Sequence, residues 1–293
     1  MLETLDAVRL ELPWLFWLGA TCLGLAVGSF LNVVIHRVPR MMERAWRSEC
    51  AELLEQPEHK PADEALTLVR PRSRCPGCGK LITALENIPV LSWLWLRGRC
   101  SRCGMRIAFR YPLVELLTAG LTLLTLWHFG PSLYGLAALV LVWSLIALSF
   151  IDLEHQLLPD QITLPVLWLG LLVSLHPQSP LEPTQAIVGA AAGYLSLWTV
   201  YHAFRLLTGK EGLGYGDFKL MGLFGAWMGW TVIPLVVLLG SVLGLIAALG
   251  VALTGRKVAG VPMPFGPFLA GAGLVALFAG EALIESYLRL SGA

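Results

Sequence analysis

The segment Gly-Tyr-Gly-Asp-Phe-Lys at Gly214–Lys219 leads directly into the apolar run Leu220–Leu253. A membrane-spanning helix needs roughly 20 apolar residues, so this run is too long for one crossing. Gly229 and Pro234 interrupt it, and we therefore expect two helices with a break between them. Asp217 lies just before this run. A carboxyl group beside a bilayer is energetically unfavourable, so its presence indicates a function.

The rest of the chain has the same apolar character. Of its 293 residues, 56% are hydrophobic, and the mean hydropathy is +0.69, which indicates an integral membrane protein. Together with the divided run, the other apolar stretches predict an all-α polytopic membrane protein with about eight transmembrane helices. Those stretches are Trp14–Val34, Leu113–Phe129, Pro131–Ile151, Ile162–Leu175, Gln185–Phe204 and Phe265–Ile284.

The first apolar stretch is expected to remain as a permanent span. It follows Glu3, Asp6 and Glu11 and lacks the basic segment that precedes the apolar part of a cleaved signal peptide.

The charges are distributed unevenly along the chain. The net charge is only +1, which excludes a generally basic nucleic-acid binder, yet 14 of the 21 Lys and Arg residues lie between Arg37 and Arg110. Placing 37–112 in the cytosol also puts the basic residues of 205–219 and the pair Arg256-Lys257 inside, as the positive-inside bias requires. Both Asp152 and Asp217 then lie at cytosolic helix ends.

The segment 37–112 is predicted to be a small cytosolic insert between the first and second spans. Its first half is polar and is expected to form an exposed helix and loop. Its second half contains two Cys-x-x-Cys-Gly turns, whose cysteines are Cys75, Cys78, Cys100 and Cys103. Two such turns supply the four thiolates of a tetrahedral zinc site, and a closed four-cysteine site is structural.

Two other interpretations of these cysteines remain open. They are a pair of disulfides, which a cytosolic location disfavours, and a thioredoxin-like redox motif, which the absence of a βαβ pattern disfavours. We expect one structural zinc ion per chain.

Asp152 and Asp217 form the most informative pair in a chain with five aspartates. Two carboxylates held close together share one proton and can act as acid and base in peptide hydrolysis. Gly214 and Gly216 are expected to adopt positive φ and to let the backbone approach an extended substrate closely. The alternative for Asp217 is a helix cap, and for Asp160, which follows Pro159, a helix-start position is favoured over a catalytic role.

Other polar residues near these aspartates have simpler interpretations. Glu154 and His155 are expected at the surface, and Lys219 is expected to face lipid headgroups.

The insert is flanked by a second patterned region. Gly28 and Asn32 close the first apolar stretch, Arg37 follows them, and Gly98 precedes the second cysteine pair. Close helix packing by Gly28 and an interhelical hydrogen bond from Asn32 are the alternatives to a binding role. Glu115, about one turn into the next apolar stretch, is expected to pair with an arginine or to line a polar site.

Taken together, these motifs resemble the type IV prepilin peptidase family, whose members are bifunctional leader peptidases and N-methyltransferases. The resemblance covers nearly the whole chain: the Gly-Ser-Phe-x-Asn segment at 28–32, both cysteine pairs, the loop from Asp152 to Asp160 and the Gly-x-Gly-Asp motif at 214–217.

The resemblance implies a reaction at the cytosolic face of the bacterial inner membrane. The leader of a prepilin or pseudopilin is cleaved after a glycine and before a residue that is usually phenylalanine, by Asp152 and Asp217. The new N-terminus is then methylated from S-adenosylmethionine.

The resemblance also implies a division into two parts. Residues 1–112 would contain the first span, the zinc insert and the methyl-transfer part, with Gly28, Asn32, Arg37 and Gly98 as cofactor-binding candidates. Residues 113–293 would form a seven-span aspartic peptidase domain, with Gly214 and Gly216 beside the substrate. Apart from membrane lipid and these substrates, no nucleic-acid partner is expected.

Three alternatives stay open at this point: a peptidase without methyl transfer, a zinc-dependent hydrolase using Glu154 and His155, and a non-enzymatic zinc-bearing membrane assembly factor.

Overall fold

The computed structural model describes residues 2–54, 66–254 and 264–291, so the predicted basic pair Arg256-Lys257 lies outside the described residues. The chain divides into two compact units, Met1–Pro131 and Ser132–Ala293. Within the described residues the regular structure is helical, with only two isolated β-bridges, both in the insert. The predicted all-α class is therefore confirmed.

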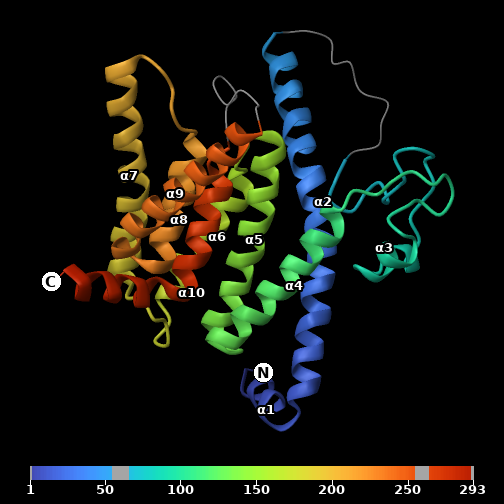
Figure 1. Ribbon diagram of the computed structural model, residues 1–293, viewed down its shortest axis with the longest axis horizontal. Helices are drawn as coiled ribbons and strands as arrows, with labels where there is room; N and C mark the ends of the chain where they lie inside the picture. The colour runs from blue at the N-terminus through green and yellow to red at the C-terminus, as the bar shows by residue number, and fades with distance from the viewer. Residues whose placement is uncertain (1, 55–65, 255–263, 292–293) are drawn as a thin grey trace. The chain divides into compact units, whose positions relative to one another are not determined.

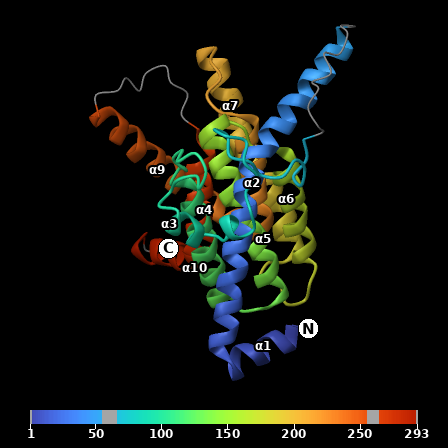
Figure 2. The same ribbon diagram turned by 90° about the vertical axis from the view of Figure 1, so that its right-hand side faces the viewer.

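The first unit is built around one long helix. Its elements are α1 (Leu2–Glu11), α2 (Pro13–Leu53), the short 3-10 helix η1 (Leu85–Asn87), α3 (Leu91–Trp95) and α4 (Arg110–Phe129). At 41 residues α2 is about 60 Å long, twice the thickness of a bilayer core. The first apolar stretch and the expected exposed helix are thus one continuous helix, which extends well beyond α4 (Figure 1). Figure 2 shows α1 leaving the end of α2 at a wide angle.

Small residues let α2 and α4 pack closely. A Cβ atom on Gly24 would lie 2.6 Å from the Cα of Ala119, and one on Gly28 would lie 2.6 Å from the Cα of Glu115. Buried threonines on α4 donate a hydrogen bond from the hydroxyl group to the carbonyl four residues earlier, as Thr118 does to Val114 at 2.7 Å. This is the small-residue contact typical of membrane helices, and it confirms the packing interpretation of Gly28.

The second unit contains the remaining helices. They are α5 (Leu133–His155), α6 (Asp160–Ser174), α7 (Pro183–Thr208), α8 (Tyr215–Met228), the 3-10 helix η2 (Trp230–Val232), α9 (Ile233–Leu253) and α10 (Gly266–Ser291). The break predicted in the long apolar run is confirmed. Helix α8 ends at Met228 because Gly229 adopts a φ of 80°, a conformation that favours glycine, and α9 begins at Ile233.

Helix α8 lies at the centre of the second unit. Ten of its residues are buried, and it packs against α6, α7 and α10. Glycines bring α7 and α8 into backbone contact: a Cβ on Gly225 would lie 1.9 Å from the carbonyl oxygen of Gly189, and one on Gly193 would lie 2.4 Å from that of Met221. After its first turn this helix is apolar on all sides, which is typical of a helix enclosed by others in a core. Its first turn carries Asp217.

Helices occur at all eight predicted places, but they differ in length. Among the described residues, five are long and apolar enough to cross a membrane: α2, α4, α5, the η2–α9 segment and α10. Helices α6 and α8 have 15 and 14 residues, so each rises only about 21–23 Å. Together these helices identify a polytopic membrane protein in which shorter helices pack among full-length ones.

The observed division of the chain falls later than the expected one. We expected a boundary at 112/113, whereas the units separate between Pro131 and Ser132, so α4 belongs to the same unit as α2. The reason is the close α2–α4 contact described above.

Candidate active site and metal-binding cluster

Asp152 lies in the last turn of α5. The helix ends there because Gln156 adopts a left-handed conformation, and its N–H donates to the carbonyl of Asp152. The carboxyl group is only 5% exposed, and its Oδ2 accepts a hydrogen bond of 3.0 Å from the N–H of Gly266, at the start of α10. A Cβ at Gly266 would lie 2.6 Å from that same oxygen, so only glycine allows this contact.

Asp217 is the third residue of α8 and is 6% exposed. Its Oδ2 accepts a hydrogen bond of 3.1 Å from the N–H of Gly214, while its own N–H donates to the Gly214 carbonyl at 3.1 Å. These reciprocal bonds form a capping box. The capping alternative is therefore confirmed for one oxygen of this carboxylate, and the other oxygen remains available.

The expected conformation of the two glycines before Asp217 is wrong. Gly214 has a φ of −85°, and neither it nor Gly216 is among the described residues with positive φ. Gly216 is instead required by close packing, since a Cβ there would lie 2.7 Å from the Cβ of Leu158. The turn after α5 thus packs directly on the first turn of α8.

Asp152 and Asp217 line one cavity of about 310 Å³. The other lining residues come from the α5–α6 turn, the linker before α8 and the segment that begins α10: Gln156, Leu158, Glu211, Gly212, Leu213, Gly214, Gly216, Pro264 and Phe265. The two carboxylates predicted from sequence therefore meet at one accessible space. Because like charges at close range do not both ionise, one group can act as base while the other acts as acid.

Lys219 and Asp160 have a different arrangement from the one expected. The Lys219 ammonium does not face headgroups alone but forms an ion pair with both carboxylate oxygens of Asp160, at 2.6 and 2.7 Å. Asp160 is the first residue of α6, as expected, but makes no side-chain cap. This pair links the starts of α6 and α8 beside the aspartates. Glu154 and His155 are exposed, as predicted.

The four cysteines of the insert form one cluster. Their sulfur atoms all lie within 4.8 Å of one another, with 3.8 Å between Cys75 and Cys103 and 4.0 Å between Cys78 and Cys100. All four are free thiols, which excludes the disulfide alternative. Zinc–sulfur bonds of about 2.3 Å in a tetrahedron separate the sulfurs by about 3.8 Å, so the four sulfurs lie close enough together to hold a metal ion.

The two cysteine turns repeat the same backbone structure. In each, the glycine after the second cysteine has positive φ, 68° at Gly79 and 70° at Gly104, and donates its N–H to the carbonyl of the first cysteine. An isolated β-bridge closes each turn, Arg74 with Leu81 and Arg99 with Arg106. The Cys-x-x-Cys-Gly pattern therefore specifies each half of the cluster locally.

The cysteines differ in acidity. Backbone N–H groups of Cys103 and Arg102 donate to the Cys100 sulfur and lower the pKa of Cys100 to about 6. The Met105 N–H acts in the same direction on Cys103, but burial and the other thiols outweigh it and raise the pKa of Cys103 to about 11. Four clustered thiols thus do not all ionise by themselves, and a bound divalent cation would stabilise the four thiolates.

Glu86 joins the two turns. Its carboxylate accepts a hydrogen bond of 2.6 Å from Lys80, which follows the first turn, and another from the hydroxyl of Ser101, inside the second. The Lys80 ammonium and the Ser101 hydroxyl lower the pKa of Glu86 to about 2. This role of Glu86 was not predicted, because its contacts join segments that are separated along the chain.

The four candidate cofactor residues all have structural contacts. Asn32 Nδ2 donates to the carbonyls of Gly28 and Tyr111, which confirms the predicted interhelical bond, and its Oδ1 is buried without a partner. The Arg37 guanidinium binds three carbonyls, those of Thr67, Leu68 and Pro71. Gly98 has a φ of 64°, and a Cβ there would lie 2.9 Å from the Trp93 ring.

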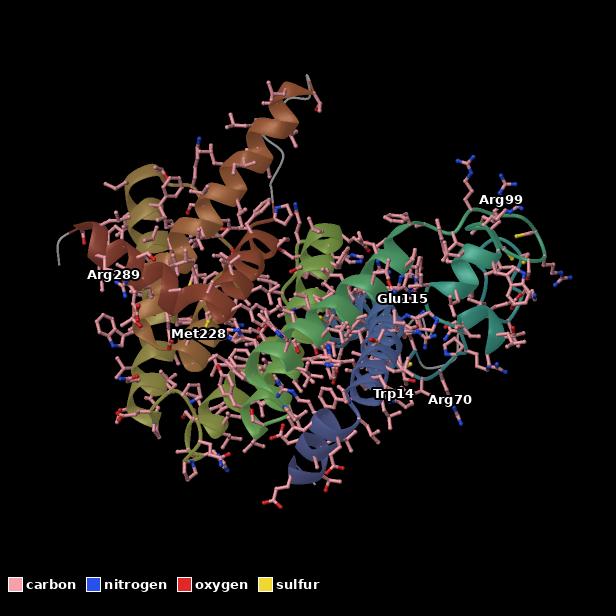
Figure 3. All side chains as sticks on the ribbon, turned by 60° about the horizontal axis from the view of Figure 1, so that its bottom comes forward. Trp14, Arg70, Arg99, Glu115, Met228 and Arg289 are labelled. Carbon is pink, nitrogen blue, oxygen red and sulfur yellow. The ribbon has the colours of Figure 1, made fainter. Side chains whose placement is uncertain are left out.

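Glu115 connects α4 to the insert through a hydrogen bond. Its Oε2 accepts a hydrogen bond of 2.7 Å from the N–H of Val90, immediately before α3, and the side chain is only 8% exposed. Figure 3 shows Glu115 on α4 beside α2. Glu115 thus binds a backbone N–H and the Ser29 side chain, and not the arginine that was one of the two expectations.

The roles of two residues near the aspartates were not predicted from the sequence. Gly266 binds Asp152 across 114 positions of sequence, and Glu211 contributes a third carboxylate to the cavity. The sequence pattern that could have identified Gly266 is Pro-Phe-Gly-Pro at Pro264–Pro267, in which two prolines flank a glycine at the start of an apolar stretch.

Comparison with known families gives two matches along the chain. Residues 22–129 match the bacterial peptidase A24 N-terminal domain, and residues 139–249 match the type IV leader peptidase family. The gap between the two matches contains the division between the two units of the structure.

Curated relatives match over almost the full length. A protein of Stutzerimonas stutzeri is 52% identical over 280 residues, which are 95% of this chain and 96% of that protein. One of Pseudomonas aeruginosa is 50% identical, with 96% of each chain covered, and one of Legionella pneumophila is 42% identical, with 97% and 98% covered. Each is named prepilin leader peptidase/N-methyltransferase. No solved structure matches. The chain therefore belongs to the type IV leader peptidase family.

Proposed function

We propose that this protein cleaves the basic leader from type IV prepilins and type II secretion pseudopilins, after glycine and before phenylalanine, and then N-methylates the new N-terminal residue. The observation that carries the peptidase proposal is the shared cavity of Asp152 and Asp217. Relatives that match along almost the whole chain, and whose name states both activities, support the proposal.

In the proposed reaction, Asp152 and Asp217 are the catalytic residues. The ionised carboxylate takes a proton from water, whose oxygen attacks the scissile carbonyl carbon, while the protonated carboxyl group donates to the carbonyl oxygen. Collapse of the tetrahedral intermediate breaks the C–N bond as the amine nitrogen takes up a proton. Backbone N–H groups from Gly214 and Gly266 hold the two carboxylates in place, and Gly214 and Gly216 lie beside the substrate.

We further propose that the cluster of Cys75, Cys78, Cys100 and Cys103 binds one structural zinc ion. Four thiolates complete a zinc tetrahedron and leave no position for a reactive water, so the metal would hold the insert together and take no part in hydrolysis. This argues against the zinc-hydrolase alternative.

Methyl transfer from S-adenosylmethionine is assigned to the first unit. We propose that Gly28, Asn32, Arg37 and Gly98 contribute to this site chiefly through structural contacts. Gly28 and Asn32 pack α2 against α4, Arg37 holds the insert to α2, and Gly98 packs on Trp93 within the insert. The relatives' name favours a bifunctional enzyme over a peptidase alone or a non-enzymatic assembly factor.

The proposed location is the bacterial inner membrane, with the insert and the aspartates on the cytosolic side. The concentration of basic residues between Arg37 and Arg110 supports this orientation. A membrane-anchored prepilin would then present its leader at the level of the aspartates.

One assay tests both activities. The purified full-length protein is incubated with a prepilin and labelled S-adenosylmethionine, and leader release and label transfer are measured separately. We expect both, with labelled product appearing only after cleavage. Intact prepilin would refute the peptidase proposal, and cleavage without label would refute the methyl-transfer proposal.

A further inference from the structure

A third carboxylate lines the cavity of the two aspartates. Glu211 lies in the linker between α7 and α8, and the eight lining residues other than the three acids are uncharged. Among the residues that the structure describes, the cavity lining thus contains no lysine or arginine. Because unlike charges attract and like charges repel, the lining favours a substrate group with positive charge.

The two aspartates face this space. Each uses Oδ2 to accept a backbone N–H, so Oδ1 of each carboxyl group, on a side chain at least 94% buried, has no hydrogen-bond partner among the described residues. Neither oxygen is among the buried unpartnered atoms of the described residues, so both are open to the cavity, where water or a ligand can complete their contacts.

Glu211 differs from the two aspartates in its surroundings. It is exposed and forms no ion pair within the described part of the chain. The nearby ammonium of Lys219 does not neutralise it, because that group is held by Asp160. Its carboxylate is therefore open to a charged substrate group that enters the cavity.

We propose that Glu211 is a specificity-determining residue that binds the basic side chain of the leader nearest the scissile bond. This inference rests on the proposed peptidase function. The aspartates would act on the peptide bond, while Glu211 would bind a neighbouring lysine or arginine and fix the register of the extended leader. Glu211 itself takes no part in proton transfer.

The test combines enzyme and substrate variants. Three prepilin peptides keep the glycine before the scissile bond and carry Lys, Gln or Glu at the position of the nearest basic leader residue, and kcat and KM are measured with the purified full-length enzyme. We expect Glu211→Gln to raise KM for the Lys peptide about fivefold, as for loss of one partly exposed ion pair, with kcat unchanged. The same variant should leave KM for the Gln peptide unchanged, and Glu211→Lys should prefer the Glu peptide.

The control is Glu182→Gln, an exposed glutamate before α7 and outside the cavity lining, which should change neither constant. Equal KM of the wild type for all three peptides, or an equal effect of Glu211→Gln on the Lys and Gln peptides, would overturn the assignment of Glu211. Failure of the wild type to cleave any of the peptides would instead refute the proposed peptidase function.

Discussion

At the scale of single residues, the site depends on how two buried acids are held. Asp152 and Asp217 sit on different helices, yet each accepts one backbone N–H from a glycine at the start of a helix, Gly266 for the first and Gly214 for the second. These hydrogen-bond donors are neutral backbone groups. A cationic partner, by contrast, would stabilise both carboxylates as anions. In the proposed reaction, this arrangement would let the pair hold one proton for acid–base exchange.

Replacing either aspartate with asparagine should stop cleavage. Asp152→Asn and Asp217→Asn each preserve volume but remove an acid–base group, so the cleavage rate should fall by about 10³-fold. Prepilin processing by the purified variants measures this. Asp160→Asn is the matched control, because it removes a neighbouring carboxylate that pairs with Lys219; we expect it to retain most of the activity. Substantial cleavage by either catalytic variant would refute the dyad.

Glu86 is the residue whose loss should loosen the metal cluster without removing a ligand. Glu86→Gln breaks the charge-assisted bond to Lys80 that joins the two cysteine turns. Because the pKa of Glu86 is lowered to about 2, its stabilising contribution is present above the ordinary glutamate value and is lost as pH falls through that value toward 2.

The measurement is the rate at which a chelator removes metal from the purified protein. We expect one zinc per chain in the wild type, faster release from Glu86→Gln, and no bound zinc in Cys75→Ser. Glu43→Gln is the control, since Glu43 forms a comparable exposed pair with Arg47 on α2 away from the cluster. Identical release from both glutamine variants would show that Glu86 does not support the site.

At the scale of elements, close helix contacts position the chemistry. Helix α8 carries Asp217 at its first turn and is enclosed by α6, α7 and α10, with α7 in contact at Gly189 and Gly193. The Asp160–Lys219 pair and the Leu158–Gly216 contact then connect its first turn with the α5–α6 turn. The position of Asp217 therefore depends on tight packing along the helix.

A methyl group in the α7–α8 contact should be destabilising. In Gly225→Ala the new Cβ would lie 1.9 Å from a backbone oxygen of Gly189, so the helices must separate, at a cost of about 1–3 kcal/mol. We expect a lower melting temperature in detergent and reduced cleavage. Gly250→Ala, on α9 with no atom within 4 Å of the added Cβ, should melt like the wild type. Equal melting of the two variants would contradict the packing argument.

At the scale of the whole molecule, the chain is a membrane protein built from two units. The first joins a 41-residue helix, α4 and the cysteine insert, and the second holds both aspartates. The two family matches lie on either side of the same division. This arrangement is the basis for proposing methyl transfer in the first unit and peptide cleavage in the second.

The proposed topology predicts which residues water-soluble reagents reach from each side. Cys50 is an exposed thiol on the part of α2 beyond the first apolar stretch and should react with an impermeant maleimide only from the cytosolic side. A cysteine introduced as Gln178→Cys, in the α6–α7 connection, should react only from the opposite side. Labelling of intact cells and of inverted vesicles measures this, with Cys50→Ala as the control. Labelling of both sites from one side would refute the eight-span topology.

Much of the fold and part of the site could be predicted from local sequence. Apolar stretches of sufficient length predict helices wherever they occur, and Gly229 predicts the break after α8, because both effects act over a few residues. The Cys-x-x-Cys-Gly turns are equally local. The position of α4 in the first unit was not predicted, since it depends on contact with Gly24 and Gly28, far away along the chain.

The sequence by itself determined the membrane class, the approximate places of the helices, the four-cysteine set and the two aspartates. Hydropathy and short-range spacing carry that information. Only the tertiary structure decided that Gly266 binds Asp152, that Lys219 pairs with Asp160 and that Glu211 joins the aspartates at one cavity. The structure also shows that Gly216 is needed for close packing on Leu158 and not for a positive φ. These contacts join residues that lie far apart in sequence, and only the packing of complete helices brings them together.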